Sequence, residues 1–263
     1  MVPSAQRNWI LIRGLARGVG HWGDFSKLFE KSFSEDKIYY VDIPGNGYLN
    51  HIKTPLKISE FIPFFEEQLR QQNFNANLPT YGYSLSLGSM AMVEWARQKP
   101  DFFSQIYISN TSAGNFSNIF KRLSYKAILL GMKISHLQDI RQKELAALLI
   151  TTSLSKEQIE QSHQQQLSSI VKYSQEYPTH PKNILRQLIA ASIFYFPREA
   201  PTEVILMSGL KDQFVSPSCT VDIEKHWKCR HHKHPTAGHD ISMQDPEWVI
   251  EKIKLGLNPS QYN

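Results

Sequence analysis

Short apolar runs alternate with longer amphipathic segments along the first 110 residues of the chain. The strand-sized apolar runs lie at 9–12, 38–43, 78–81 and 104–110. The segments between them repeat apolar residues at three- and four-residue spacing, as helices with one buried face do, at 25–33, 59–72 and 89–97. Strands that alternate with helices favour a parallel sheet covered on both faces. The pattern therefore predicts an α/β fold with a mostly parallel central sheet.

The alternation stops near residue 114 and resumes near residue 201. Four consecutive segments with helical periodicity lie between these points, at 119–132, 137–150, 155–173 and 184–196. A strand at 203–209, a helix beginning at Pro217, a strand around 229–235 and a closing helix at 246–257 then restore the α/β pattern. We therefore predict a core made of residues 1–113 and 201–263, with residues 114–200 inserted as a helical segment.

Composition agrees with a globular protein. Of the 263 residues, 41% are hydrophobic and 20% are charged, and no run approaches the roughly 18 apolar residues of a membrane-spanning helix. Residues 1–7 lack the basic and apolar regions of a signal peptide, and two cysteines, Cys219 and Cys229, do not make a disulfide framework. We expect a cytoplasmic protein with neither an integral membrane segment nor a nucleic-acid partner.

The net charge of +5 is concentrated in the predicted insertion. Between residues 114 and 200 there are eleven Lys and Arg residues against six Asp and Glu residues, and the rest of the chain is neutral. The insertion therefore has a basic surface, which is either a docking face or an ordinary solvated face.

A candidate nucleophile lies between the third predicted strand and its helix, in Gly82-Tyr83-Ser84-Leu85-Ser86. A sharp turn from strand to helix requires small residues two places on either side of its tip, and Gly82 and Ser86 meet this requirement for Ser84. We therefore expect Ser84 at the tip with its hydroxyl exposed. The free N–H groups of the following helix would face it, which suits an oxyanion. An ordinary strand–turn–helix junction would give the same pattern.

Two further polar residues, Asp212 and His239, follow later predicted strands. Ser84, Asp212 and His239 would all lie at the carboxyl edge of the sheet, where open α/β sheets bind ligands. A serine hydroxyl is a poor nucleophile at neutral pH and needs a base within hydrogen-bond reach. His239 would take the proton, and Asp212 would orient the imidazole and stabilise its charged form.

Histidines concentrated near the end of the chain raise the alternative of a metal site. They are His226, His231, His232, His234 and His239. Zinc requires three or four ligands, and no carboxylate or cysteine completes a known spacing here. We therefore predict neither a metal nor a cofactor.

Four segments resemble motifs of the α/β-hydrolase family, and the likeness covers nearly the whole chain outside the insertion. The segments are Gly82-Tyr83-Ser84-Leu85-Ser86, Arg13-Gly14, Gly209-Leu210-Lys211-Asp212-Gln213-Phe214-Val215 and Gly238-His239. Two departures are visible: Ser86 stands where the family has a second glycine, and Arg13 where it usually has histidine. The resemblance implies the α/β-hydrolase fold and a Ser84, Asp212, His239 triad that works through an acyl-enzyme intermediate.

The same resemblance implies how the substrate would be held. The backbone N–H groups of Leu15 and Leu85 would form the oxyanion hole, with Ala16 as the second candidate in the loop after the first strand. Residues 114–200 would form a cap, or lid, over the site. The pocket walls would include Tyr83 and Trp22.

Within the family, the chain is similar to the small bacterial esterases typified by pimeloyl-[acyl-carrier protein] methyl ester esterase. The likeness rests on size, on the Gly-x-Ser-Leu sequence, on Asp-Ile-Pro-Gly-x-Gly after the second strand and on the compact insertion. It implies that basic residues of the cap receive an acidic acyl carrier protein. The candidates for this docking are Lys121, Arg122, Lys126, Arg141 and Arg186, with Lys133 and Lys143 nearby.

The sequence therefore predicts a serine hydrolase that cleaves a small-molecule or carrier-borne carboxylic ester. Two alternatives remain. The departures at Arg13 and Ser86 are compatible with a hydrolase-like fold kept as a catalytically silent binding protein. A C–C bond hydrolase or lyase could use the same three side chains.

Overall fold

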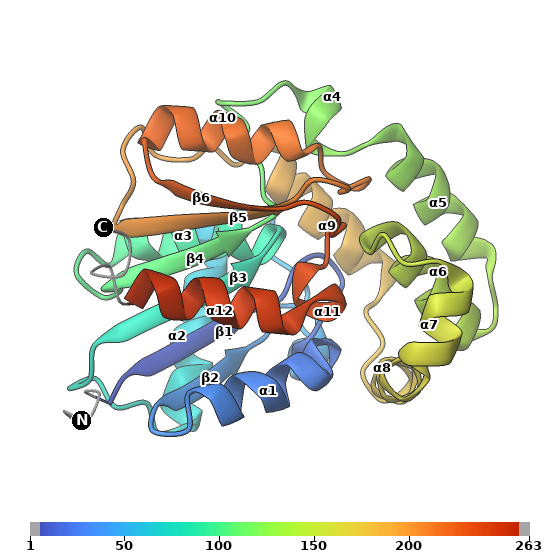
Figure 1. Ribbon diagram of the computed structural model, residues 1–263, viewed down its shortest axis with the longest axis horizontal. Helices are drawn as coiled ribbons and strands as arrows, with labels where there is room; N and C mark the ends of the chain where they lie inside the picture. Colours follow the sequence, from blue (N-terminus) through green and yellow to red (C-terminus); the bar gives the residue numbers. More distant parts are fainter. Residues whose placement is uncertain (1–5, 258–263) are drawn as a thin grey trace.

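A parallel β-sheet lies at the centre of the computed structural model, which describes residues 6–257 apart from the side chains of residues 119, 126, 130 and 135 (Figure 1). Within this range the sheet has six strands in the order β2-β1-β3-β4-β5-β6, and every pair is parallel. The strands are β1 (Asn8–Ile12), β2 (Lys37–Val41), β3 (Thr80–Leu85), β4 (Gln105–Ser109), β5 (Glu203–Gly209) and β6 (Arg230–His234). The predicted α/β architecture is confirmed.

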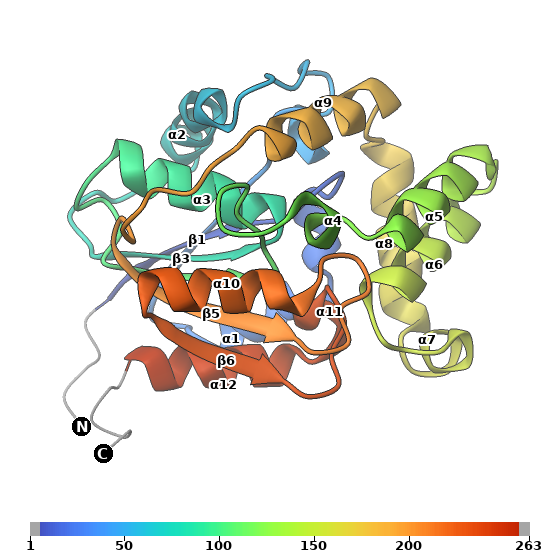
Figure 2. The ribbon, with the colours of Figure 1, turned by 90° about the horizontal axis from the view of Figure 1, so that it is seen from above.

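Alternate strand residues supply two cores, one on each face of the sheet. Ile10 and Ile12 of β1 pack into the core on one face, and Trp9 and Leu11 pack into the core on the other. The first face is covered by α2 (Ile62–Gln71), α3 (Leu87–Gln98) and α10 (Pro217–Trp227), and the second by α1 (Asp24–Ser32), α11 (Ile241–Gln244) and α12 (Pro246–Leu257) (Figures 1 and 2). Short 3₁₀ helices η1 (Val19–Trp22), η2 (Gly47–Leu49) and η3 (Ile58–Phe61) follow the first two strands.

Strand β3 runs four residues further than the sequence predicts. The predicted strand ended at Tyr81, but β3 continues to Leu85 because it is paired on both sides, with β1 and with β4. Ser84 is opposite Ile12 of β1 and Ile108 of β4. Ser84 is therefore a residue of the sheet interior.

The predicted insertion is helical and lies at one end of the sheet (Figures 1 and 2). Its helices are α4 (Ile119–Arg122), α5 (Tyr125–His136), α6 (Ile140–Thr151), α7 (Lys156–Ser162), α8 (Gln164–Glu176) and α9 (Pro181–Ser192). The first predicted helix is split because Ser124 caps a new one, accepting a hydrogen bond from Ala127 N. The third is split at His163. We refer to residues 114–200 as the helical insertion.

The helical insertion has a small core of its own, made by Leu148, Ile159, Leu167 and Ile170. Met243 of α11, a helix that packs on the sheet, also belongs to this cluster. The insertion and the sheet domain therefore share a hydrophobic contact next to the carboxyl edge of the sheet. None of the helices in the described part of the chain has both the length and the apolar character needed to span a bilayer.

Candidate active site

The turn between β3 and α3 is centred on Ser86. Ser86 has φ 57° and ψ −117°, a conformation that costs a side-chain-bearing residue strain, and α3 begins at the next residue. The prediction that Ser84 stands at the tip of the turn is wrong. Ser84 is fully buried within β3, and its hydroxyl donates a hydrogen bond to Ser89 Oγ at 3.2 Å. A strained serine between a strand and a helix is the geometry of a nucleophile elbow, and here that serine is Ser86.

The sequence contains a second, overlapping match to the same motif. In Ser84-Leu85-Ser86-Leu87-Gly88 the small residues on either side of Ser86 are Ser84 and Gly88. A Cβ at Gly88 would lie 2.6 Å from the carbonyl oxygen of Ile12 and would also collide with that of Arg13. A glycine at position 88 is therefore what allows α3 to start against the end of β1. Gly82 is explained by core packing, because a Cβ there would meet Met92.

We expect Gly88→Ala to destabilise the protein by about 2 kcal/mol or more, because its Cβ would collide with the backbone carbonyls of Ile12, the last residue of β1, and of Arg13, which follows it. Gly131→Ala is the matched control. Gly131 lies in α5, and nothing lies within 4 Å of the position its Cβ would take. Since alanine is the better helix former, this control should gain about 0.5–1 kcal/mol. Urea unfolding of both variants measures the difference, and equal effects would contradict the close approach.

Asp212 and His239 are paired as the sequence predicts. The distance between His239 Nδ1 and Asp212 Oδ2 is 2.7 Å, and both side chains are buried. The second carboxylate oxygen of Asp212 accepts hydrogen bonds from Phe214 N at 2.8 Å and Val215 N at 2.9 Å. The turn after β5 thus fixes the carboxylate, and the carboxylate fixes the orientation of the imidazole ring.

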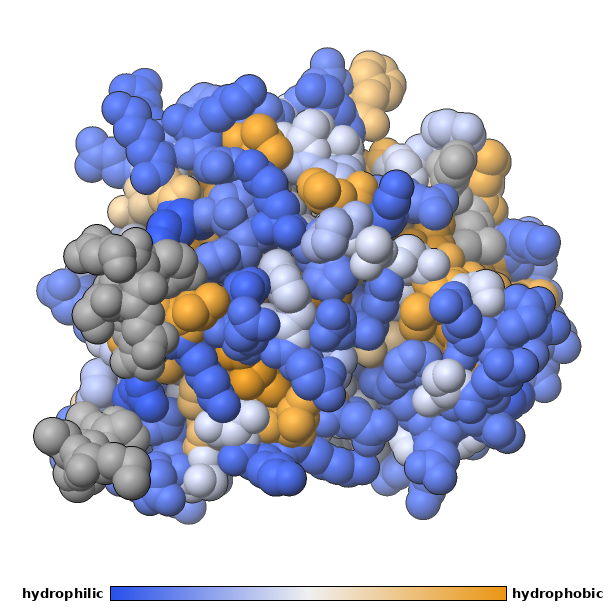
Figure 3. All heavy atoms as spheres, in the orientation of Figure 1, coloured by the Kyte–Doolittle hydropathy of each residue, from blue (hydrophilic) through white to orange (hydrophobic). Residues whose placement is uncertain are grey.

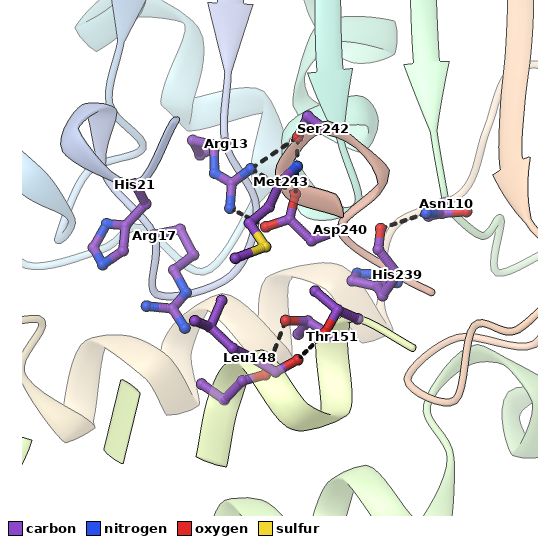
Figure 4. A network of polar contacts seen from close by, with 12 residues as sticks. Arg13, Arg17, His21, Asn110, Leu148, Thr151, His239, Asp240, Ser242 and Met243 are labelled. Carbon is purple, nitrogen blue, oxygen red and sulfur yellow. Dashed lines mark hydrogen bonds and ion pairs between the residues drawn. The ribbon is translucent and has the colours of Figure 1, made fainter. Parts of the chain in front are cut away.

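Residues 110 and 111, directly after β4, connect the serine turn to the histidine loop. Asn110 Nδ2 donates to the carbonyl oxygens of Gly238 and His239, and Asn110 Oδ1 accepts from Gly209 N at 2.9 Å (Figure 4). Thr111 Oγ1 donates to the carbonyl oxygen of Ser86 at 3.0 Å. Adjacent residues of one segment therefore hold the backbones of Ser86 and His239 at the same edge of the sheet.

Two backbone N–H groups beside Ser86 are available to an oxyanion. Within the described part of the chain, neither Leu15 N nor Leu87 N has a hydrogen-bond acceptor. A Cβ at Gly14 would lie 3.1 Å from Ser86 Cβ and 3.7 Å from Leu87 N, so the loop after β1 abuts the turn. The predicted donor Leu85 lies inside β3, one residue before Ser86. The second candidate, Ala16, already donates its N–H to Gln187 Oε1 at 3.0 Å.

Arg13, which occupies the family's usual histidine position, forms a buried ion pair with Asp240. Its Nη2 lies 2.5 Å from Asp240 Oδ2 and its Nη1 lies 3.1 Å from Oδ1 (Figure 4). The guanidinium also stacks over the Trp22 ring at 4.7 Å and donates to Ser242 Oγ. Burial on its own would raise the pKa of Asp240, but Arg13 and hydrogen bonds from Ser242 and Met243 hold it below its usual range. Arg13 therefore ties the loop after β1 to the residue that follows His239.

The helical insertion packs directly onto these loops. Asp240 N donates to the carbonyl oxygen of Thr151 at the end of α6, at 2.6 Å. Arg17 forms an ion pair with Glu144 of α6, and Glu144 also accepts from Ser174 of α8 at 2.8 Å. Figure 4 shows the loop residues Arg13, Arg17 and His21 on one side and α6 on the other.

His21 belongs to the same group of polar side chains between the loops and the helical insertion, and it is uncharged at neutral pH. Its Nε2 lies 3.0 Å from Ser174 Oγ, so it belongs to the same network as Glu144. Burial, followed by the nearby cations Arg17 and Arg13, lowers the pKa of His21 well below its ordinary value. Hydrogen bonds therefore connect the loops to the insertion, with Arg17 and Glu144 as the charged pair that crosses between them.

The residues predicted to line a pocket belong to the core instead. Tyr83 and Trp22 are buried together with Phe25 in the core on the α1 side of the sheet. Tyr83 points to that side because it is the residue before Ser84 in a strand whose side chains alternate. Because the turn is centred on Ser86 rather than on Ser84, the reason for expecting Tyr83 beside the substrate no longer holds.

Two of the five residues predicted to dock a carrier protein turn inward. Arg122 donates to the carbonyl oxygens of Ala191 at 2.7 Å and Ser192 at 3.1 Å, and Arg186 donates to that of Thr54. Lys121 and Arg141 are exposed, while the side chain of Lys126 is outside the described residues. The predicted docking set is therefore not one continuous cationic face.

The C-terminal histidines have structural partners rather than a shared centre. His231 lies 2.8 Å from Ser208 Oγ and 2.7 Å from Glu224, and His234 lies 3.0 Å from Asp245. Over the described residues, no three His, Cys, Asp or Glu side chains are grouped as metal ligands.

Comparison with solved structures identifies the fold. The structure is similar to an esterase from Rhodococcus sp. (TM-score 0.72, 14% identity, 95% of this chain and 89% of that chain). It is also similar to an esterase from Thermogutta terrifontis (TM-score 0.71, 13% identity, 96% and 90%) and to a lipase-esterase related protein from Clostridium acetobutylicum (TM-score 0.65, 15% identity, 94% and 93%). No protein-family profile and no curated protein sequence matches the chain. The chain has the α/β-hydrolase fold that the sequence motifs predicted.

Proposed function

We propose that the protein is a serine hydrolase of carboxylic esters in which Ser86 is the nucleophile, His239 the general base and Asp212 the residue that orients it. The observation that carries the proposal is the strained Ser86 turn at the same sheet edge as the His239–Asp212 pair. The esterases among the similar structures support ester hydrolysis as the reaction class. This proposal replaces Ser84 with Ser86 and Leu85 with Leu87.

The chemistry follows from the hydrogen bonds. Because Asp212 accepts from Nδ1, the other ring nitrogen of His239 is left to take the proton of Ser86 as its oxygen attacks the ester carbonyl. The negative charge that develops on the carbonyl oxygen would be received by the N–H groups of Leu15 and Leu87. The imidazolium then returns the proton to the departing alcohol, and a water activated by the same base hydrolyses the acyl-enzyme.

The alternative of a silent binding protein rested on two departures from the family pattern, and neither of them removes a catalytic group. With Ser86 as nucleophile, the small residue two places after it is Gly88, and the departure from the family's two glycines moves to Ser84, two places before it. Arg13 has a partner of its own in Asp240, and the oxyanion donors of the proposal are backbone N–H groups that its side chain does not replace. The choice between an ester and a C–C bond is one for substrate assays.

A fluorophosphonate probe tests the assignment directly. We expect covalent labelling of the wild type and of Ser84→Ala, and none of Ser86→Ala, because the probe phosphonylates a serine activated by a base. Circular dichroism spectra that match the wild type would establish that each variant is folded. Labelling of Ser86→Ala, or failure to label the folded wild type, would overturn the proposal.

A further inference from the structure

Helix α5 presents its apolar side to solvent. Tyr125, Ile128, Leu129 and Met132 follow the spacing of one helix face, and each side chain is at least 50% exposed. Ala127 is buried on the opposite side of the helix. Helix α5 therefore has apolar residues on both sides, and the stripe on its outer side is left uncovered. Phe120 of the adjacent α4 extends the stripe and is 86% exposed.

A second exposed stripe lies on α9 and the segment after it. Leu185, Ile189 and Ile193 follow four-residue spacing, and Tyr195 is exposed beyond them. Arg122 joins the two stripes, because it belongs to α4 and its guanidinium donates to the carbonyl oxygens at the end of α9. Apolar atoms reach the surface over α4 and α5 at the upper right of Figure 3. We call these two stripes together the apolar surface.

The segments that carry the apolar surface have positive charges only. Residues 114–138 and 177–198, which contain both stripes, include no aspartate or glutamate. Lys121, Lys133 and Lys182 are exposed beside the stripes. An exposed apolar area rimmed by cations matches the interface of an anionic bilayer, where apolar side chains enter the acyl boundary and lysines meet the headgroups.

We propose that the apolar surface docks the protein on anionic lipid bilayers. A second copy of this chain fits the surface less well, because like charges would face each other across the contact. An acidic carrier protein would pair with the lysines but would leave large aromatic and aliphatic side chains without apolar partners. The bilayer satisfies both features of the surface.

A groove beside the apolar surface connects the proposed docking to the proposed ester hydrolysis, on which this step of the proposal rests. A cavity of about 370 Å³ lies between α5 and α6 and is lined by Lys133, Ile134, Leu137, Ala146, Leu149, Ile150 and Gln213. Gln213 follows Asp212 in the chain, so one wall of the groove comes from the turn that holds the Asp212 carboxylate. The lining suits an acyl chain that leaves the bilayer with its ester group directed toward the site.

Vesicle flotation tests the docking without any catalysis, using the Ser86→Ala protein. We expect binding to vesicles of phosphatidylcholine with phosphatidylglycerol, and binding at least about tenfold weaker to phosphatidylcholine alone, since each lysine near the surface adds attraction to anionic lipid. Phe120→Ser/Leu129→Ser should weaken binding about tenfold, because two anchoring side chains are lost. Its matched control is Tyr48→Ser/Leu56→Ser, an exposed aromatic and leucine outside the apolar surface.

A second pair of variants tests how much the lysines contribute to binding anionic lipid. Lys121→Glu/Lys133→Glu should weaken binding to anionic vesicles about tenfold or more, whereas Lys31→Glu/Lys225→Glu makes the same change in net charge and should leave binding near the wild-type level. Absence of binding to anionic vesicles, or equal losses in variant and control, would overturn the proposal. So would a dimer in sedimentation that dissociates in Phe120→Ser/Leu129→Ser. Absence of ester hydrolysis by the folded wild type, with vesicle binding retained, would overturn only the proposed function.

Discussion

Replacing Ser86 with alanine is expected to lower kcat/KM for a p-nitrophenyl ester by about 10³-fold or more, while Ser84→Ala keeps activity near that of the wild type. The reason is positional: Ser86 is at the strained turn, and Ser84 is inside β3 with its hydroxyl bonded to Ser89. Removing a nucleophile that acts as one unit with its base abolishes nearly all of the covalent route. Removing a buried neutral hydrogen bond costs only about 1 kcal/mol of stability.

The two variants are each other's control, because both remove one serine hydroxyl and the positions differ by two residues. Initial rates at saturating and subsaturating ester separate kcat from KM, and thermal unfolding measures the stability of each protein. If Ser84→Ala lost activity and a folded Ser86→Ala kept it, Ser84 would be the nucleophile and the elbow geometry would have no catalytic meaning.

Breaking the Arg13–Asp240 pair should have the second largest effect, on stability and on pH dependence together. Arg13→Met and Asp240→Asn each leave one buried charge without its partner, which costs about 3–5 kcal/mol. The double variant should recover much of this loss, because no charge remains. Urea unfolding of the three variants forms a double-mutant cycle, and additive losses would contradict the pairing.

The pH dependence of stability should change with the same variants. Because Arg13 and the hydrogen bonds from Ser242 and Met243 hold the pKa of Asp240 below its usual range in the folded protein, the pair stabilises the fold above the pKa that Asp240 has in the unfolded chain, and this stabilisation is lost as the pH falls. Asp240→Asn should therefore lose less stability than the wild type between neutral and acid pH in urea unfolding, and an unchanged pH dependence would contradict the charge pairing.

Most strands of the sheet could be predicted because each of them is a short apolar run that is visible in the local sequence. The apolar runs at 9–12, 38–43 and 203–209 all became strands, and the interruption of the strand–helix alternation marked the helical insertion. Asp212 and His239 each follow a strand that the sequence predicted, and the hydrogen bond expected between them is present. Features that depend on a few consecutive residues could therefore be predicted from the sequence.

The serine at the turn was missed because the position of the turn depends on where β3 ends, which is not a local property of the sequence. Two serines two residues apart both satisfy the small-residue rule, and the choice between them depends on where β3 ends. That end is set by pairing with β1 and β4, so the sequence of β3 alone does not contain it. The partner of Arg13 was missed for a similar reason. Asp240 lies 227 positions away along the chain, and the sequence pattern pointed to His239, the residue before it, as the functional side chain of this loop.

The contacts between the loops and the helical insertion have a consequence for how such a protein can diversify. Ala16 is bonded to Gln187, Arg17 to Glu144, and Asp240 to Thr151, so two helices of the insertion, α9 and α6, contact the loops around the proposed site directly, and α8 supports α6 through the Ser174–Glu144 hydrogen bond. Replacing the helices between β4 and β5 by a different set would leave a half-buried arginine and two backbone N–H groups, one of them in the histidine loop, without these partners. New substrate preferences are therefore more accessible through point changes on α5, which contributes none of these three contacts, than through exchange of the whole segment.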